Sequence, residues 1–335
     1  MSNSDVGSAS SLSWRAGRSA FAPGAASPPR LALTETSFWA MGCECQVLVL
    51  GGSAGLVEQG ERYTRTLEDR WTRFRADSEL SRFNARTGNW VSISPELSVL
   101  LWRGLAGFRM SGGLFNPFLG SQIRGVGYDR DFAELDPATV DDESHPGERS
   151  ALMPLAIPHP LEFRRNRRIA RLNPGLEFDS GGIGKGLGAA MIVEHLIRAG
   201  AAGAMASLGG DVAVGGSWPD EGWRIGIEDP TGRTDQPMNV VLREGSICTS
   251  GILKRRWRES SGTVSHHILD PATGKSLAGS NVVAASAIAR QGWRAEVFTK
   301  MAIIGGSQVA DQIVRRNSGV ALLVWDRTGS VSTVQ

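Results

Sequence analysis

A glycine-rich run at residues 179–186 has the residue types of a phosphate-binding loop. It reads Asp-Ser-Gly-Gly-Ile-Gly-Lys-Gly and lies between a predicted strand and a predicted helix. Glycines let a ligand approach the backbone closely, and the N–H groups at a helix start, with the cation of Lys185, suit a phosphate or pyrophosphate. The run lacks the Ser or Thr that follows the lysine of a Walker A loop and the spacing of a Rossmann fingerprint. A turn that only serves helix packing would have the same composition.

Two shorter motifs offer further polar groups. The run Ser-Leu-Gly-Gly-Asp at 207–211 either brings Asp211 toward a ligand or forms a plain hairpin turn. Ser250 and Gly251 end a predicted strand, and the basic residues that follow at 254–256 either meet phosphate or face solvent.

Two adjacent histidines provide the candidate acid or base. His266 and His267 occupy a predicted strand at 266–269 that runs into an Asp-Pro turn. Neighbouring residues of a strand point to opposite faces, so at most one of the two readily faces a given pocket. His267, four residues before Pro271, is the candidate for proton transfer, although a lone histidine in a strand is usually structural.

The composition is that of an ordinary globular protein. Of the 335 residues, 41% are hydrophobic and 21% are charged, and the formal net charge is +2. This charge gives no reason to expect a nucleic acid as a binding partner. The arginine-rich run at 164–168 is predicted to be a solvated turn. No uncharged apolar run is long enough for membrane insertion. Three cysteines do not make a disulfide framework, so we expect reduced thiols, with Cys43 and Cys45 on one face of a strand.

The first 34 residues are rich in Ser, Ala, Gly, Pro and Arg and lack the apolar segment of a signal peptide. We therefore expect a disordered leader at 1–34, a cytoplasmic location and one folded domain at 35–335.

The elements that must position these residues follow from apolar periodicity and turn residues. Helices are predicted at 57–73, 95–110, 184–199, 291–304 and 308–316, with Ser94 as the N-cap of the second. Strands are predicted at 38–50, 204–207, 212–214, 223–227, 239–242, 246–250, 282–288, 321–324 and 331–334, with a hairpin at 163–178 and an irregular insertion at 129–159. Mixed helices and strands without strict alternation indicate an α+β fold.

Seven short blocks, in the same order along the chain, resemble the ApbE family, the FAD:protein FMN transferases. They are Ala40-Met41-Gly42, Ser-Glu-Leu-Ser-Arg-Phe-Asn at 78–84, Gly-Leu-Phe-Asn-Pro at 113–117, the run at 179–186, Leu-Gly-Gly-Asp at 208–211, Thr-Ser-Gly at 249–251, and the segment from His267 to Pro271 with Thr273-Gly274. The resemblance spans about residues 36–325, nearly all of the expected domain.

The resemblance implies an enzyme that binds FAD and moves its FMN half onto a Ser or Thr hydroxyl of a client flavoprotein, with release of AMP. It also implies one compact α+β domain built from two T-fold-like halves, with mixed or antiparallel sheets, flanking helices and the ligand between the halves. His267 would be the catalytic residue that assists proton removal from the client hydroxyl. The implied FAD-binding residues are Ala40, Met41, Gly42, Phe74, Asp179, Lys185, Asp211, Ser250 and Gly251.

A magnesium site is also implied, and here the chain departs from the family. The family usually has an Asp and, four residues later on the same helix, a Thr, with a backbone carbonyl from the glycine run. In this chain Glu296 and Lys300 hold the two helix positions, and Gly182 provides the carbonyl. Glu296 and Lys300 also make a favourable i,i+4 ion pair, so the open alternatives are a salt bridge without metal and an ammonium that replaces part of the cation's charge. We keep Mg²⁺ as the expected cofactor.

Two other functions are compatible with the same residues. One is hydrolysis of FAD to FMN and AMP, and the other is FAD binding without catalysis. Release of AMP separates the two enzymes from the binder, and covalent flavin on a client separates the transferase from the hydrolase. A nicotinamide dehydrogenase is disfavoured by the missing Rossmann spacing.

Overall fold

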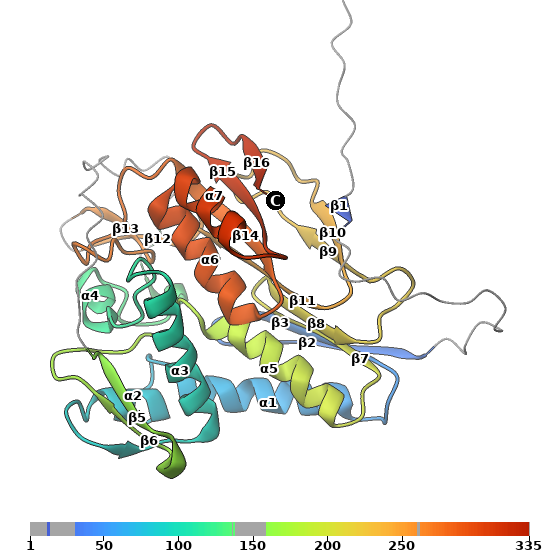
Figure 1. The fold of residues 1–335 in the computed structure, drawn as a ribbon, viewed down its shortest axis with the longest axis horizontal. Coiled ribbons are helices and arrows are strands. Elements are labelled where there is room, and N and C mark those ends of the chain that lie inside the picture. Colours follow the sequence, from blue (N-terminus) through green and yellow to red (C-terminus); the bar gives the residue numbers. More distant parts are fainter. Residues whose placement is uncertain (1–11, 14–30, 136, 138–158, 260–261, 335) are drawn as a thin grey trace, which may run out of the picture.

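A computed structural model describes residues 12–13, 31–135, 137, 159–259 and 262–334 (Figure 1). Within these ranges one large sheet contains strands β2 (Leu33–Ala40), β3 (Cys43–Leu50), β7 (Gly203–Leu208), β8 (Asp211–Gly216), β11 (Gly245–Gly251), β14 (Val282–Ala289), β15 (Ala321–Asp326) and β16 (Val331–Val334). Their spatial order is β16-β15-β14-β11-β8-β7-β3-β2, and each neighbouring pair is antiparallel.

The large sheet consists of two halves with the same order of elements. In the first half, β2 and β3 are followed by helices α1 (Leu56–Trp71) and α5 (Gly184–Arg198), and then by β7 and β8. In the second half, β11 and β14 are followed by α6 (Gly292–Gly305) and α7 (Ser307–Arg316), and then by β15 and β16. The halves meet where β8 pairs with β11. The predicted α+β fold with antiparallel sheets is confirmed.

The four helices lie across one face of the sheet (Figure 1). Helix α6 is buried on nearly every side because it packs against α5, β11 and β14 at once, which explains why its sequence has no single apolar stripe. Strand β14 is also buried along most of its length. Since alternate residues of a strand point to opposite faces, both of its faces are covered. On the face away from α6 its core neighbours include Trp223 and Ile225.

Three smaller sheets and several short elements accompany these halves in the described part of the chain. Between α1 and α5 lie α2 (Glu79–Asn84), β4 (Val91–Ser92), α3 (Pro95–Met110), α4 (Gly120–Gly125), the 3₁₀ turns η1 (Phe132–Glu134) and η2 (Arg165–Arg167), β5 (Leu161–Arg164) and β6 (Ile169–Leu172). Strand β9 (Trp223–Ile227) pairs with β10 (Met238–Leu242), and β10 pairs in parallel with β1 (Leu12–Ser13). Strands β12 (Arg256–Arg258) and β13 (Val264–His266) form a hairpin before β14.

Several predicted boundaries are confirmed. Helix α3 begins at Pro95 and ends at Met110, and the hydroxyl of its N-cap Ser94 accepts the N–H of Leu97 at 3.1 Å. The hairpin predicted at 163–178 is formed by β5 and β6, with its turn inside the predicted range, but it begins two residues earlier, at Leu161, and ends at Leu172. Cys43 and Cys45 are both buried on one face of β3, as expected from their spacing, and all three cysteines are free.

The strand predicted at 266–269 is wrong in its position. Strand β13 ends at His266, because the ring Nδ1 of that histidine accepts the N–H of Ile268 at 3.3 Å and the backbone then turns away. Helices α2 and α4 were not expected from the sequence. Each of these helices has six residues, which is too short for apolar periodicity to be recognised in the sequence.

Two expected segments fall largely outside the described residues. These are the leader at 1–34, within which Leu12–Ser13 and the first residues of β2 form strands, and the insertion at 129–159, of which η1 is described. Among the described residues, no helix combines the length and the apolar character needed to cross a lipid bilayer.

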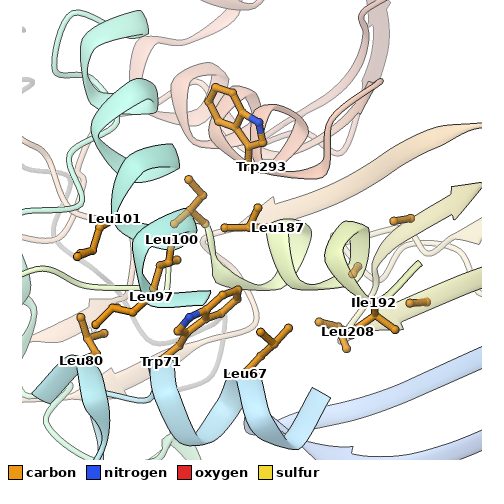
Figure 2. Close-up of a cluster of buried hydrophobic side chains, with 14 of the residues drawn as sticks. Leu67, Trp71, Leu80, Leu97, Leu100, Leu101, Leu187, Ile192, Leu208 and Trp293 are labelled. Carbon is orange, nitrogen blue, oxygen red and sulfur yellow. The ribbon is translucent and has the colours of Figure 1, made fainter. Parts of the chain in front are cut away.

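The core beneath the glycine-rich run fixes its direction. Figure 2 shows Trp71 of α1 and Leu97 of α3 facing Leu187 of α5, all of them buried. Asn84 at the end of α2 holds the backbone just before the run, since its amide donates to the carbonyl of Phe178 at 2.9 Å and accepts the N–H of Phe178 at 3.0 Å. The first turn of α5 is therefore packed and hydrogen-bonded from both sides.

We predict that Gly292→Ala destabilises the fold. A Cβ at Gly292 would lie 2.0 Å from the carbonyl oxygen of Gly186, so the first turns of α6 and α5 would be forced apart. The free energy of unfolding should fall by about 1–3 kcal/mol, measured by urea denaturation. Gly125→Ala is the matched control, because a Cβ there meets nothing within 4 Å. Equal stability of the two variants would show that the turns are not in contact.

Candidate functional site

Two cavities of about 460 and 540 Å³ meet between the halves of the protein. The first cavity lies on the side of α1, α4 and the run at 179–186, and the second lies along β3, β9 and β11. Five residues line both cavities, and we call them the junction: Gly181, Lys185, Arg255, His267 and Lys300. Three of the five carry a positive charge, so an anion that spans the two cavities would be held at the junction.

The run at 179–186 is a loop that leads directly into α5. The hydroxyl of Ser180 donates to the carbonyl of Trp71 at 2.8 Å, and the carbonyl of Ser180 accepts the N–H of Gly184 at 2.8 Å. Gly181, Gly182 and Gly184 line the first cavity. The loop thus presents backbone, without intervening side chains, at the positive end of a 15-residue helix.

Lys185 is held at the junction by a buried carboxylate. Its Nζ lies 2.6 Å from Oδ2 of Asp211, whose exposed fraction is 1%, and Oδ1 of Asp211 accepts the N–H of Thr249 at 3.0 Å. Burial alone would lower the pKa of Lys185, but the Asp211 carboxylate raises it above its ordinary value. The lysine is therefore a cation. Asp211 lies behind Lys185, where it positions the ammonium, and it lines neither cavity.

A second buried ion pair lies on α6. The side chain of Glu296 has no exposed surface, and its Oε1 accepts a hydrogen bond from Nζ of Lys300 at 3.1 Å. The other oxygen, Oε2, accepts the N–H of Gly186 at 2.8 Å. Burial raises the pKa of Glu296, while the charge of Lys300 opposes that rise. The carboxylate consequently ties Lys300 to the first turn of α5.

The residues at this pair do not fit a magnesium ion. Mg²⁺ requires an octahedral set of oxygen ligands, whereas both oxygens of Glu296 already have partners and one partner is an ammonium. The hydroxyl of Thr299 donates to the carbonyl of Glu296 at 2.7 Å and contacts Ser250 Oγ at 2.7 Å. In the described part of the chain, no three His, Cys, Asp or Glu side chains are grouped to hold a metal. We therefore derive no step through Mg²⁺ at Gly182, Glu296 and Lys300.

The first cavity has an aromatic wall, formed by Phe74 and Tyr128. The guanidinium of Arg73 lies 4.3 Å from the ring centre of Phe74 and 4.5 Å from that of Tyr128, and Arg73 Nε lies 3.0 Å from Oδ1 of Asp179. Phe74 keeps 39% of its surface exposed. An exposed ring that is held by a cation and by a second ring is suited to stacking on a planar ligand.

The turn between β2 and β3 closes the other side of the first cavity. Met41 and Gly42 both have a left-handed backbone, with φ of 53° and 65°, and the N–H of Met41 donates to Oε1 of Glu68 at 2.6 Å. Both residues line the cavity. Ala40 precedes them as a buried strand residue and does not line it.

The two histidines have different roles. Burial lowers the pKa of His267 well below its ordinary value, and the charge of Arg255 lowers it further, so the imidazole is neutral. Its Nδ1 is buried and has no hydrogen-bond partner among the described residues. A neutral imidazole with an unsatisfied nitrogen can accept a proton from a ligand, and a bound phosphate would offset the neighbouring cations that oppose its protonation. His266 instead has both ring nitrogens engaged, with Nε2 donating to the carbonyl of Leu277 at 3.0 Å.

The structure brings most of the predicted site residues to the cavity walls. Those that line a cavity are Met41, Gly42, Phe74, Asp179, Gly182, Lys185, Ser250, Gly251, His267 and Lys300. Ala40, Asp211 and Glu296 lie behind the walls. Of the basic residues at 254–256, Arg255 is part of the junction, while Nζ of Lys254 pairs with Oε2 of Glu228 at 2.9 Å.

Sequence reasoning missed Arg73 and Tyr128. Arg73 is the last residue of the helix predicted at 57–73, although α1 itself ends at Trp71. In the sequence it looks like any basic residue in a last helical turn, so its position carries no signal. Tyr128 is one of only two tyrosines in the sequence, and its place directly before the expected insertion at 129–159 was the one available hint.

Comparisons with known proteins find relatives along most of the chain. The model of the ApbE family matches residues 41–324. A FAD:protein FMN transferase of Treponema pallidum is 30% identical over 266 residues, which are 74% of this chain and 71% of that protein. A second one, from Vibrio cholerae, is 27% identical over 68% of this chain and 67% of that protein.

Solved structures show the same fold. The ApbE protein from Thermotoga maritima superposes with a TM-score of 0.74 at 21% identity, covering 91% of this chain and 97% of that one. The flavin transferase ApbE from Vibrio cholerae gives a TM-score of 0.71 at 19% identity, covering 91% of this chain and 98% of that one.

We predict that His266 makes stability depend on pH. Burial lowers its pKa to about 4, compared with about 6.5 in an unfolded chain. Its contribution is therefore complete above pH 6.5 and is lost as the pH falls toward 4, by about 3 kcal/mol in the free energy of unfolding. As the pH falls through this window, the free energy of unfolding measured by urea denaturation should decrease more steeply for the wild type than for His266→Gln. Parallel profiles would mean that this imidazole is solvated in the folded protein.

Proposed function

The chain belongs to the ApbE family, and we infer from this membership that it is a FAD:protein FMN transferase. The observation that supports this activity is the junction, where three cations and a neutral imidazole lie between two cavities. One cavity has the aromatic wall and the glycine loop that a flavin dinucleotide requires. The other remains for the client protein.

We place FAD in the first cavity with its pyrophosphate at the junction. The flavin ring would stack on Phe74, which is held by Arg73 and Tyr128. The pyrophosphate would meet the backbone at Gly181 and Gly182 and the ammonium of Lys185, at the start of α5. Both Phe74 and the loop line the same cavity, so one ligand can contact them together.

The client hydroxyl would arrive through the second cavity. Displacement at phosphorus proceeds with the attacking and leaving oxygens roughly in line, so the two groups must reach the phosphate from opposite sides. The two cavities meet at the same five residues, which provides two approaches to one phosphate. The acceptor we propose is a Ser or Thr hydroxyl of a client flavoprotein.

The transfer breaks the phosphoanhydride linkage of the FAD pyrophosphate and forms a phosphoester with the client hydroxyl. The hydroxyl oxygen bonds to the phosphorus of the FMN half, and the bond from that phosphorus to the bridging oxygen breaks. AMP leaves with the bridging oxygen, and the hydroxyl proton passes to His267. Lys185, Arg255 and Lys300 stabilise the charge on the phosphate oxygens, because fixed cations in a partly buried site need no reorganisation during the reaction.

A cytoplasmic location stays a prediction from the leader's composition.

We predict that His267→Ala abolishes transfer to the client. Without the imidazole no group at the junction accepts the hydroxyl proton, so the rate should fall by about 100-fold or more. The protein, FAD and an FMN-accepting client domain are mixed, and covalent flavin is read as fluorescence of the client band on a denaturing gel, with AMP release followed in parallel.

The matched control is His195→Gln. His195 stacks on Tyr63 with ring centres 4.6 Å apart and lines neither cavity, so this variant should label the client normally. Wild-type release of AMP without client labelling would identify a FAD hydrolase. Neither product from a protein that binds FAD would identify a binding protein.

A further inference from the structure

We propose that the ammonium of Lys300 performs the task of a divalent cation in this enzyme, so that FMN transfer proceeds without Mg²⁺. This inference rests on the proposed function, and it names Lys300 as a catalytic residue that contacts the FAD pyrophosphate. It follows from the position of the ammonium, from how it is held, and from the misfit of a metal at the same place.

The position of Lys300 is that of a phosphate ligand. It lines both cavities and shares the junction with the glycine loop and His267. Only 11% of its side-chain surface is exposed, so its charge acts in a poorly solvated setting, where an ion pair with phosphate is stronger than in water. A surface lysine with a free side chain would have neither property.

The ammonium is fixed relative to the loop that binds the phosphate. Glu296 connects the two, because one oxygen accepts from Lys300 Nζ at 3.1 Å and the other from the N–H of Gly186 at 2.8 Å. An ammonium has three donors. Among the described residues, Glu296 takes one of them, and the others are available to phosphate oxygens. A lysine held in this way acts as a preorganised cation rather than a mobile one.

The charges at the junction are sufficient for a pyrophosphate without metal. Lys185, Arg255 and Lys300 at the junction contribute three positive charges. The carboxylates of Asp211 and Glu296 behind them contribute two negative charges, which leaves a net charge of +1 over these five charged side chains. The positive end of α5 adds roughly half a charge. A bound pyrophosphate diester would thus be largely neutralised by the protein alone.

A divalent ion would be repelled from the same place. Lys300 Nζ lies 3.1 Å from Glu296 Oε1, so a metal bound to that oxygen would lie close to a like charge, and the remaining oxygen of Glu296 is directed to a backbone N–H. Thr299, the nearest hydroxyl along the helix, is engaged by the Glu296 carbonyl and by Ser250. The same atoms therefore hold either the lysine or a metal, and this chain holds the lysine.

The first experiment removes metals from the wild type and follows two quantities. FAD affinity is measured by quenching of flavin fluorescence, and FMN transfer is measured by client labelling, each with EDTA and with added Mg²⁺. We expect both quantities to be the same under the two conditions. Mn²⁺ titration followed by electron paramagnetic resonance should show no Mn²⁺ bound to the protein beyond what FAD itself binds. Loss of transfer in EDTA together with protein-bound Mn²⁺ would overturn the proposal.

The second experiment changes the pair itself. Lys300→Met removes the charge at similar volume, and the FAD dissociation constant without metal should rise about tenfold or more, with loss of transfer. The double variant Glu296→Gln with Lys300→Met keeps a neutral buried pair, and circular dichroism checks that it folds. It should show the same losses. Unchanged FAD affinity in a folded double variant would show that Lys300 does not contact the pyrophosphate.

The affinity measurement separates this proposal from the assigned activity. If the wild type binds FAD without metal but never labels a client, the transferase assignment fails, while the contact of Lys300 with FAD is still decided by the two variants. If the wild type labels the client only with Mg²⁺, the transferase assignment stands and the role of Lys300 fails.

Discussion

The site depends on one contact between helices, where the first turn of α6 touches the first turn of α5. Gly186 and Gly292 allow the two backbones to meet, and Glu296 then accepts the N–H of Gly186 from a fully buried position. This single carboxylate connects the half of the sheet that supplies the glycine loop with the half that supplies Lys300. The pairing of β8 with β11 joins the two halves, and the Glu296 hydrogen bond sets the spacing of the junction cations by linking the first turn of α5 to the helix that carries Lys300.

The cost of this arrangement is the burial of four charged side chains in two ion pairs. A buried pair adds little net stability, because desolvation offsets most of the attraction, whereas loss of one partner is strongly destabilising. The Lys185–Asp211 and Glu296–Lys300 pairs are therefore better explained by the ligand than by the fold. Each places a lysine at a cavity wall and keeps its carboxylate behind the wall. In this way each pair presents its ammonium to the ligand and keeps its own carboxylate out of the cavity lining.

Much of this could be predicted from the sequence, and what could not has physical reasons. Long periodic elements such as α3, and the loop that precedes α5, follow from apolar spacing, caps and glycines. His267, chosen from the sequence as the candidate acid or base, lines both cavities. The end of β13 at His266, three residues before the predicted end at 269, was not predicted, since it depends on a side-chain hydrogen bond within the turn. Arg73 and Tyr128 were missed because their contact joins residues 55 positions apart through ring stacking on a cation, which no local pattern records. The choice between metal and ammonium at Glu296 was likewise open until the partners of both carboxylate oxygens were known.

The central claim is that the pyrophosphate of FAD is held by protein cations at the junction. The most direct test is a crystal structure of the protein with FAD, grown with Mn²⁺ so that anomalous scattering locates any bound metal. The account predicts pyrophosphate oxygens within hydrogen-bond distance of Nζ of both Lys185 and Lys300, and no anomalous peak at Glu296. A Mn²⁺ peak between Glu296 and the phosphates, with Lys300 turned away, would contradict it.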